Sequence, residues 1–207
     1  MTGRQTEQEQ HWAGPAGDAY IERQRLTIES RRAMFKRILD STDPKPDSIM
    51  EYGASVGDNL RAIRALLGAH LAGTDINQQA LEDLKQIANE TFYGSITDPC
   101  VGNLPKWDMT MTRGVLIHIP PDQLAKAYAT LYRRSSRYIL IAEYYNPKPV
   151  MIPYRGQDNL LWKRDFAGEM MDDYPDLKLR DCGFVYHRDP EHPQDDVTWF
   201  LLEQEQR

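Results

Sequence analysis

The sequence predicts an α/β fold, a doubly wound sheet of about seven mostly parallel strands with helices on both faces. Three observations predict it. Between residues 48 and 145, short apolar runs alternate with segments of helical periodicity, as in a parallel sheet covered by helices. A glycine-containing turn directly follows the first apolar run. Near the end of the chain, two strand-like runs are joined by so few residues that they must pair antiparallel.

The first 47 residues precede the sheet. Residues 1–17 are polar, and we expect no regular structure in them. From residue 18 to 40, apolar residues recur at helical spacing, which predicts a helix that caps the fold. The breaker STDPKPD follows at 41–47. We therefore divide the chain into an N-terminal extension with a capping helix (1–47) and a sheet domain (48–207).

Five apolar runs form the parallel part of the sheet. We expect these strands at 48–52, 70–76, 91–96, within 107–119 and at 137–145, and helices at 58–68, 77–90 and 120–134. Each helix places its apolar residues on one face, and the prolines at 120 and 121 suit a helix N-terminus. The run RYILIAEYY is apolar enough to be buried on both sides of the sheet.

After residue 145 the alternation stops. Residues 146–162 are rich in proline and aromatic residues and have no clear period. We interpret about 146–165 as an insertion on the substrate side of the sheet, followed by a short helix at 163–175. The strands at 177–189 and 196–204 then form the antiparallel terminal hairpin.

Composition narrows the classes of function. The chain has 207 residues, a formal net charge of −6 and a pI of about 5.4. Because nucleic-acid binding draws most of its affinity from phosphate neutralisation, we expect no nucleic-acid partner. No apolar run approaches the ~18 residues of a membrane span, and the N-terminus lacks a signal-peptide pattern. We expect a cytoplasmic protein without a membrane partner.

Cysteine and histidine spacing gives no strong metal signal. Cys100 and Cys182 lie far apart and show no metal-ligand spacing, so we expect reduced, structural thiols. HRDPEHPQDD at 187–196 carries two histidines and four acids, which could hold a metal ion. We favour a polar hairpin turn there and expect no metal.

Residues 53–57, Gly-Ala-Ser-Val-Gly, allow two interpretations. They fit G-x-S-x-G, the nucleophile elbow of serine hydrolases, and also a turn where a cofactor approaches a strand end. An elbow needs several strands before it, and residues 1–47 supply none. Asp75 ends the next strand, where an acid grips a ribose through its hydroxyl groups. No late histidine is singled out as a triad partner for Ser55, so we favour a cofactor turn.

The acid Glu51 at the end of the first strand separates two classes of cofactor. Dinucleotide-binding turns usually read G-x-G-x-x-G, whereas this one reads E-x-G-x-x-x-G. A carboxylate there would repel a pyrophosphate but suits a ligand with an ammonium group, such as S-adenosylmethionine. A nicotinamide-dependent oxidoreductase stays as an alternative, as does a non-catalytic cofactor-binding partner in a biosynthetic assembly.

Five motifs carry a family resemblance. IMEYGASVGDNL, LAGTDIN, FYGSI, WDMTMTRGVLIHIPPDQL and YILIAEYYNP follow in order those of class I S-adenosylmethionine-dependent methyltransferases. The chain resembles that family over roughly 18–204. The segments around HWAGPAGDAYIERQ, PVMIPYRGQDNLLW and CGFVYHRDPEHPQDDVTWF further resemble the small methylase family associated with pseudaminic acid biosynthesis.

The resemblance implies a Rossmann-like fold, S-adenosyl-L-methionine as methyl donor and S-adenosyl-L-homocysteine as product. It also implies a small-molecule acceptor, an anionic sugar-like metabolite methylated on a hydroxyl or amine. A monomer and a homodimer are both compatible with the sequence.

The cofactor-binding residues follow from the turn and the resemblance. Asp75 accepts both ribose hydroxyls, or else caps the next helix. Tyr20 covers the sulfonium by a cation–π contact, or simply packs there. The remaining predicted residues form the turn, flank the adenine or lie near the methyl group: Glu51, Gly53, Ser55, Gly57, Ile76, Ser95, Ile96, Arg113, Gly114 and Val115.

The acceptor side is predicted from two groups of residues. His118 or Tyr145 would take the proton of a hydroxyl acceptor; alternatively, His118 packs between strand and helix with a hydrogen bond to the backbone. Basic and aromatic side chains after residue 143 would bind the acceptor, or form an ordinary surface loop. Arg155 is the first choice for a carboxylate, because arginine can donate two parallel hydrogen bonds to one. These substrate-binding candidates are Tyr144, Tyr154, Arg155, Trp162 and Lys163.

Overall fold

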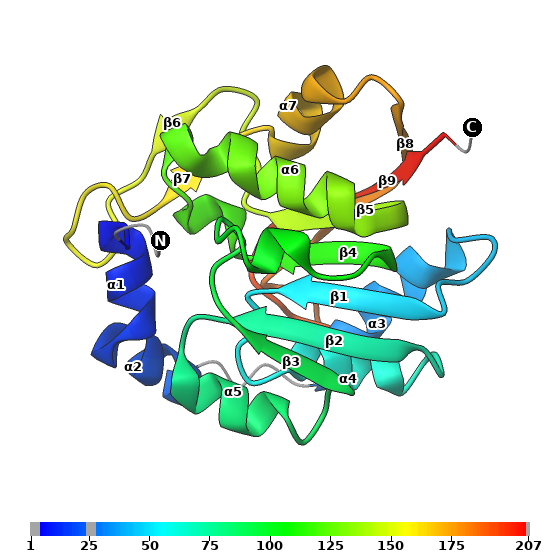
Figure 1. Cartoon of the computed structure of the whole chain (residues 1–207), viewed down its shortest axis with the longest axis horizontal. Helices are drawn as coiled ribbons and strands as arrows, with labels where there is room; N and C mark the ends of the chain where they lie inside the picture. The colour runs from blue at the N-terminus through cyan, green and yellow to red at the C-terminus, as the bar shows by residue number, and fades with distance from the viewer. Residues whose placement is uncertain (1–4, 24–27, 206–207) are drawn as a thin grey trace.

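A seven-stranded sheet forms the centre of the protein (Figure 1). The computed structural model describes residues 5–23 and 28–205. The strand order is β3-β2-β1-β4-β5-β9-β8, with β1 to β5 parallel and β9 antiparallel to both β5 and β8. The predicted fold class is confirmed. The strands are β1 (Ser48–Tyr52), β2 (His70–Asp75), β3 (Glu90–Tyr93), β4 (Trp107–Arg113), β5 (Ser135–Glu143), β8 (Leu177–Val185) and β9 (Val197–Gln204).

Helices cover both faces of the sheet (Figure 1). One face packs against α3 (Ile28–Asp40), α4 (Asp58–Arg64) and α5 (Gln78–Leu84). The other face packs against α6 (Leu124–Arg134) and α7 (Phe166–Asp173). Short 3-10 turns, η1 (Val101–Asn103), η2 (Leu116–His118) and η3 (Pro121–Gln123), connect the strands to the helices on this second side. No described helix has both the length and the apolar character needed to cross a bilayer.

Two helices are shorter than the periodicity predicts. α4 ends at Arg64 and α5 at Leu84, although apolar residues continue at helical spacing beyond each. Each helix is followed by a short connection to the next strand, β2 from His70 or β3 from Glu90, and backbone hydrogen bonds hold the starts of these strands. The backbone N–H of His70 donates to Asp47 at 2.8 Å, and that of Asn89 donates to Leu71 at 2.7 Å.

The insertion after β5 contains a small sheet that no sequence pattern predicts. β6 (Val150–Met151) pairs antiparallel with β7 (Trp162–Lys163). The loop between them contains two non-glycine residues with positive φ, Arg155 and Asn159. The sequence correctly predicted the absence of a long regular element, but the short pairing joins Val150 to Lys163 and Met151 to Trp162, residues too far apart in the chain for a local pattern to show.

The expectation of no regular structure in residues 1–17 was wrong for the described part of that segment. α1 (Glu7–Ala13) and α2 (Pro15–Arg23) form there and lie beside the carboxyl ends of the parallel strands (Figure 1). Thr6 accepts from the backbone of Glu9 at 3.1 Å, and Glu9 accepts from the backbone of Thr6 at 2.8 Å. This capping box, with a proline at the first position of α2, was the available signal.

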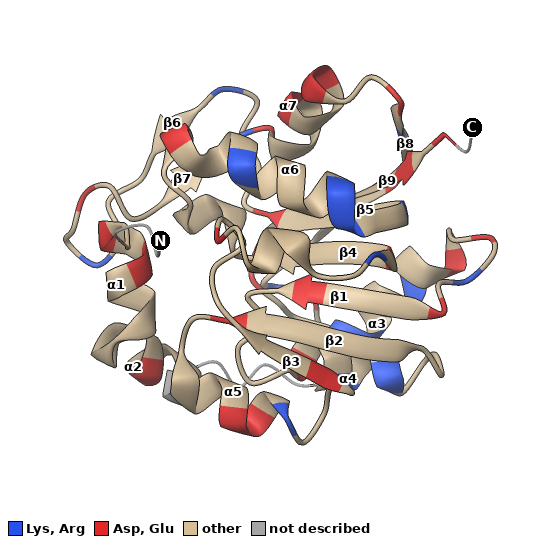
Figure 2. Cartoon of the chain, viewed as in Figure 1, with Lys and Arg blue, Asp and Glu red and all other residues tan. Residues whose placement is uncertain are grey.

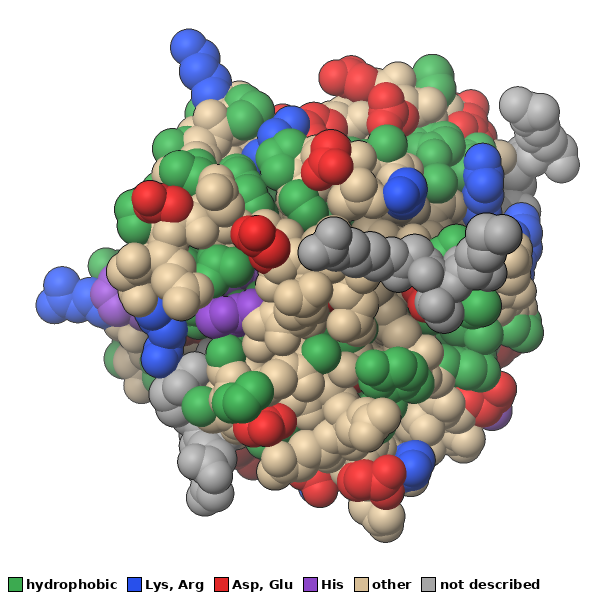
Figure 3. Space-filling model, turned by 60° about the vertical axis from the view of Figure 1, so that its left-hand side comes forward, with side chains coloured by type: hydrophobic (Ala, Val, Ile, Leu, Met, Phe, Trp, Pro, Cys, Tyr) green, Lys and Arg blue, Asp and Glu red, His purple; other side chains and the backbone are tan. Residues whose placement is uncertain are grey.

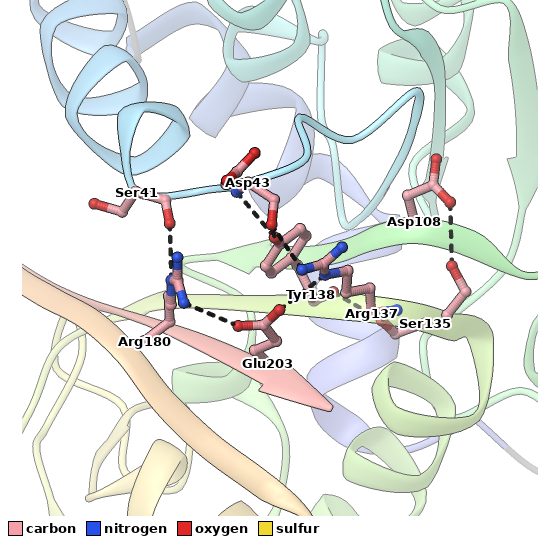
Figure 4. Close-up of polar contacts among 9 residues, drawn as sticks. Ser41, Asp43, Asp108, Ser135, Arg137, Tyr138, Arg180 and Glu203 are labelled. Carbon is pink, nitrogen blue, oxygen red and sulfur yellow. Dashed lines mark hydrogen bonds and ion pairs between the residues drawn. The ribbon is translucent and has the colours of Figure 1, made fainter. Parts of the chain in front are cut away.

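The opposite, amino end of the sheet is held by a polar network (Figure 4). Asp108 at the start of β4 accepts from the backbone N–H groups of Asp47 and Ser48, at 2.9 and 3.0 Å, and from the Ser136 hydroxyl at 3.1 Å. These bonds tie the entry of β1 to the entries of β4 and β5.

A second part of the network joins the terminal hairpin to the loop before β1. Glu203 pairs with Arg137 at 2.8 Å and with Arg180 at 3.5 Å. Arg180 also donates to the carbonyl of Ser41 at 3.1 Å, and the Tyr138 hydroxyl donates to that of Asp43 at 3.0 Å. Asp108, Arg137, Arg180 and Glu203, drawn in Figure 4, therefore all have partners for their side chains, whereas Asp43 takes part through its backbone.

Candidate functional site

A cavity of about 1220 Å³, including the open space at its mouth, lies beyond the carboxyl ends of β1, β2 and β4. Its walls come from the turn after β1, the strand ends, the segment after β3, and α1 and α2. In Figure 2, acidic residues mark the ends of β1 and β2 beside these helices. The face shown in Figure 3 has scattered charges rather than a basic band. The position is where open α/β sheets bind ligands.

The turn after β1 brings backbone close to the cavity. Gly53 has φ 71°, and a Cβ there would lie 2.5 Å from the Val115 side chain. Ser55 also has a positive φ, of 49°, an uncommon conformation for a residue with a side chain. Gly53 and Ser55 line the cavity as predicted, whereas Gly57 does not. A Cβ at Gly57 would lie 2.8 Å from Leu84, so this glycine lets the turn pack against α5.

Asp75, the last residue of β2, holds the turn and faces the cavity. One carboxylate oxygen accepts from the backbone N–H of Ser55 at 2.7 Å and the other from that of Asn77 at 2.8 Å. Burial raises the pKa of Asp75, although these bonds oppose the shift. Asn77, rather than Asp75, is the N-cap of α5, accepting from Ala80 at 3.0 Å. A carboxylate has about four acceptor positions, so further donors can bind.

Glu51 lies behind the turn, completely buried, and does not line the cavity. Its Oε1 accepts from the Asn59 amide at 2.6 Å, while Oε2 has no partner within the described chain. Burial raises the pKa of Glu51 to about 8, despite the bond from Asn59 and the charges of Arg31 and Arg113. A buried carboxyl group with one unpartnered oxygen is costly unless a donor or positive charge reaches it.

Arg31 is a cavity residue that the sequence analysis missed. It extends from α3, is 5% exposed, donates to the Asn59 amide oxygen and lies 3.8 Å from the Asp58 carboxylate. Its Nε has no partner within the described chain. A signal existed, because Arg31 falls on the same helix face as Met34, Phe35 and Ile38, where an arginine is out of place unless it has a function.

α1 and α2 close one side of the cavity through Trp12. Its ring lies 4.5 Å from His118, 5.4 Å from Tyr20 and 6.0 Å from Tyr154, measured between centroids. Polar contacts outside this aromatic cluster hold the helices in place. Gln8 donates to the Asn159 carbonyl at 2.7 Å, and Asn77 donates to Asp18 at 2.7 Å.

The turn after β4 forms the opposite wall. Glu143 at the end of β5 is 2% exposed and accepts from the backbone N–H groups of Val115 and Leu116, each at 3.1 Å. Burial raises its pKa to about 7. This anchoring carboxyl group was not predicted from the sequence. The other predicted cofactor residues that line the cavity are Tyr20, Ile76, Ser95, Ile96, Arg113, Gly114 and Val115.

The two predicted bases have different surroundings. The ring Nδ1 of His118 lies 2.6 Å from the Leu160 carbonyl, and burial lowers the pKa of His118 to about 4. His118 therefore has the packing and backbone bond that the sequence left open as its alternative role, although it also lines the cavity. Tyr145 lies outside the cavity, 41% exposed, with its ring 5.7 Å from that of Phe200.

None of the five predicted substrate residues lines the cavity itself. Tyr154 is nearest, with its ring 5.6 Å from that of His118. The Lys163 ammonium lies 5.2 Å from the Tyr144 ring centre, and the exposed Arg155 lies 5.7 Å from that of Tyr154. Trp162 is buried in β7. Arg155 lies exposed in the loop between the paired strands β6 and β7.

The hairpin turn places His187 against Asp196, with Nδ1 2.8 Å from a carboxylate oxygen. Within the part of the chain that the structure describes, no three His, Cys, Asp or Glu side chains gather closely enough to share a metal ion.

Comparison with solved structures relates this fold to methyltransferases. Magnesium protoporphyrin IX methyltransferase (ChlM) from Synechocystis PCC 6803, solved with bound SAM, matches with a TM-score of 0.63 at 14% identity, over 99% of this chain and 100% of that one. Streptomyces venezuelae DesVI matches with a TM-score of 0.61 at 9% identity, over 89% of this chain and 95% of that one. An S-adenosylmethionine-dependent methyltransferase from Clostridium acetobutylicum ATCC 824 matches with a TM-score of 0.60 at 10% identity, over 91% of this chain and 98% of that one. No protein-family model and no curated protein matches the chain.

Proposed function

We propose that the chain is an S-adenosylmethionine-dependent methyltransferase that acts on a hydroxyl or amine of a small, acidic, sugar-like metabolite. One observation carries the proposal. A single cavity combines close backbone approach at Gly53, a ribose-type acid at Asp75 and, behind the turn, the buried carboxyl group of Glu51. Two structures of the same fold, ChlM and the N-terminal domain of EvdMO1, were solved with bound SAM and SAH respectively.

The residues present fit this cofactor. The unpartnered oxygen of Glu51, behind the turn, suits the ammonium group through a bridging water, and the buried Arg31 suits the carboxylate of the same methionine moiety. Asp75 would accept from the ribose hydroxyls. Trp12 and Tyr20 would cover the methyl-donor end. The adenine would lie between Ile76 and the segment after β3, against Ser95 and Ile96.

When bound, S-adenosylmethionine supplies an electrophilic methyl group on a sulfonium, and transfer to oxygen or nitrogen leaves S-adenosylhomocysteine. The protein's part is to position both reactants and exclude water. α1 and α2 provide the exclusion by closing one side of the cavity. An amine acceptor needs only to be neutral, whereas a hydroxyl must lose a proton, for which His118 is the cavity-lining candidate.

The acceptor class rests on the sequence. The resemblance to methylases of pseudaminic acid gene clusters supports an anionic, cytoplasmic sugar metabolite. In addition, the EvdMO1 domain was crystallised in the presence of SAH and D-fucose, and it matches with a TM-score of 0.60 at 13% identity over 86% of this chain.

Calorimetric titration with S-adenosylmethionine and S-adenosylhomocysteine tests the proposal. We expect micromolar binding that Asp75→Ala weakens at least about 100-fold, because it removes two hydrogen bonds to a charged group worth roughly 1.5–3 kcal/mol each. Asp83→Ala is the matched control, since Asp83 is an exposed aspartate on α5.

Absence of binding by the folded wild type would overturn the proposal. Binding of a nicotinamide dinucleotide in its place would indicate the oxidoreductase. Tight cofactor binding without methyl transfer to any acidic sugar would indicate a non-catalytic partner.

A further inference from the structure

Arg113 is a cation in the cavity without a carboxylate to neutralise it. It ends β4, lines the cavity, and takes part in none of the ion pairs between described residues. Its Nε is buried and has no partner in the described chain. Burying such a group without a partner is costly. By contrast, Arg31 in the same cavity has Asp58 and Asn59 beside it.

Gln194 holds the Arg113 side chain in place. This glutamine comes from the hairpin turn between β8 and β9 and is 2% exposed. Its amide oxygen accepts from the Arg113 Nη2 at 3.2 Å, and its amide nitrogen donates to the Ser30 carbonyl at 2.9 Å. Both ends of the amide are therefore engaged, so the guanidinium is oriented by a neutral group. The charge of Arg113 reaches the buried Glu51, but Arg113 forms no ion pair with a described carboxylate.

The surroundings of Arg113 are those of an acceptor site. Burial raises the pKa of both Tyr20 and Tyr144. The charge of Arg113 opposes part of this increase, which places both phenols within reach of its charge. These phenols therefore stay protonated and can donate hydrogen bonds. The negative charge of Asp195 also reaches both tyrosines, but it forms no ion pair with Arg113.

We propose that Arg113, positioned by Gln194, binds the carboxylate of the methyl acceptor. The inference rests on the proposed function and refines it, because the predicted acid-binding residue Arg155 lies exposed outside the cavity. Arg113 ends β4 and lies near enough to Arg31 for its charge to lower the pKa of Arg31, after burial the second-largest effect. Only Arg31 has Asn59 and Asp58 beside it, so we assign Arg31 to the carboxylate of the cofactor and Arg113 to that of the acceptor.

The test uses a pair of probes that differ only in charge. Protein saturated with S-adenosylhomocysteine is titrated with N-acetylneuraminate, a nine-carbon acidic sugar, and with its methyl ester. We expect wild type to bind the acid at least about 10-fold more tightly than the ester, because a charge-assisted pair contributes roughly 1.5–3 kcal/mol. Arg113→Gln should bind both alike, and Gln194→Ala should reduce the acid-to-ester ratio.

Two control variants should show the same ratio of acid affinity to ester affinity as the wild type if the inference holds. Arg188→Gln removes an exposed charge from the same hairpin turn as Gln194. Arg155→Gln tests the residue that the sequence favoured, and loss of the ratio in this variant alone would overturn the inference. Should Arg113→Gln fail to fold, Arg113→Lys and Gln194→Ala make the same test, with a reduced ratio expected in each.

Separate titrations distinguish the two sources of carboxylate. S-adenosylhomocysteine should bind Arg113→Gln within about twofold of wild type. A large loss for this ligand but not for methylthioadenosine, which has no carboxylate, would assign Arg113 to the cofactor and overturn the inference. Wild type that binds the acid and the ester equally well, or that binds neither of them, would also overturn the inference. Failure of wild type to bind S-adenosylhomocysteine at all would instead refute the proposed function.

Discussion

The two ends of the sheet hold their carboxyl groups differently. At the amino end, the partly exposed Asp108 and Glu203 each accept several hydrogen bonds or ion pairs (Figure 4), although the buried Nε1 of Trp107 and Nε of Arg134 there have no partner within the described chain. At the carboxyl end, buried atoms of Glu51, Arg31 and Arg113 have no partner within the described chain.

The difference shows what each end is for. Polar groups that hydrogen-bond to one another stabilise the fold. Removing one of them leaves its partners without a hydrogen bond, and the fold then bears the desolvation cost of those partners. Polar groups held by the scaffold but left unpartnered favour binding of a complementary ligand at some cost in stability. Substitutions at the two ends should therefore have their effects in different measurements.

The largest contrast is between two aspartates. Asp108→Ala should lower the free energy of unfolding by about 2 kcal/mol, because it deprives two backbone N–H groups and a hydroxyl of their acceptor. It should leave the affinity for S-adenosylhomocysteine unchanged, whereas Asp75→Ala should reduce that affinity. Urea denaturation and calorimetry on both variants check this, and a comparable loss of affinity in Asp108→Ala would contradict the division between the two ends.

A smaller effect is expected at the cover of the cavity. Trp12→Ala removes the ring that packs on His118, Tyr20 and Tyr154. We expect the affinity for S-adenosylhomocysteine to fall about 10-fold, equivalent to about 1.4 kcal/mol, mainly through faster dissociation. Stopped-flow measurement of the two rate constants checks this. Unchanged dissociation would show that the aromatic cluster does not cover the ligand.

The third effect is in the pH dependence of stability. Glu51 has a pKa of about 8 in the folded protein, above the ordinary value of 4.5. The folded state therefore holds the proton more tightly, so the free energy of unfolding should fall as pH rises from about 6.5 to 8. The slope for one group is up to about 1.4 kcal/mol per pH unit. Glu51→Gln should flatten the profile, measured by urea denaturation at several pH values.

Two other titratable groups matter for that measurement. One sets the lower limit of its pH range, and the other provides a control variant. Burial lowers the pKa of His118 to about 4, so its opposite contribution is complete by about pH 6.5. Glu143, with a pKa of about 7, contributes in the same direction as Glu51, so Glu143→Gln should flatten only the lower part of the range. Identical profiles for wild type and Glu51→Gln would show that Glu51 is ionised in the folded protein.

The sequence by itself determined the sheet and the first part of the site. Strand and helix periods, the turn at residues 53–57 and the position of Asp75 depend on residues near one another in the chain. The short run of residues after a parallel strand can face only the carboxyl edge of the sheet. Local pattern was therefore enough to place Gly53, Ser55 and Asp75 at one cavity.

Only the tertiary structure decided which charges meet there. Arg31 reaches Asn59 because α3 packs beside α4, and Gln194 bonds to a residue 164 positions away. Arg155, in contrast, lies exposed in the loop between two short paired strands. Such contacts depend on how whole elements pack, which periodicity does not encode. The glycine turn thus follows from the sequence, whereas the arginine that we propose for the acceptor follows from the fold.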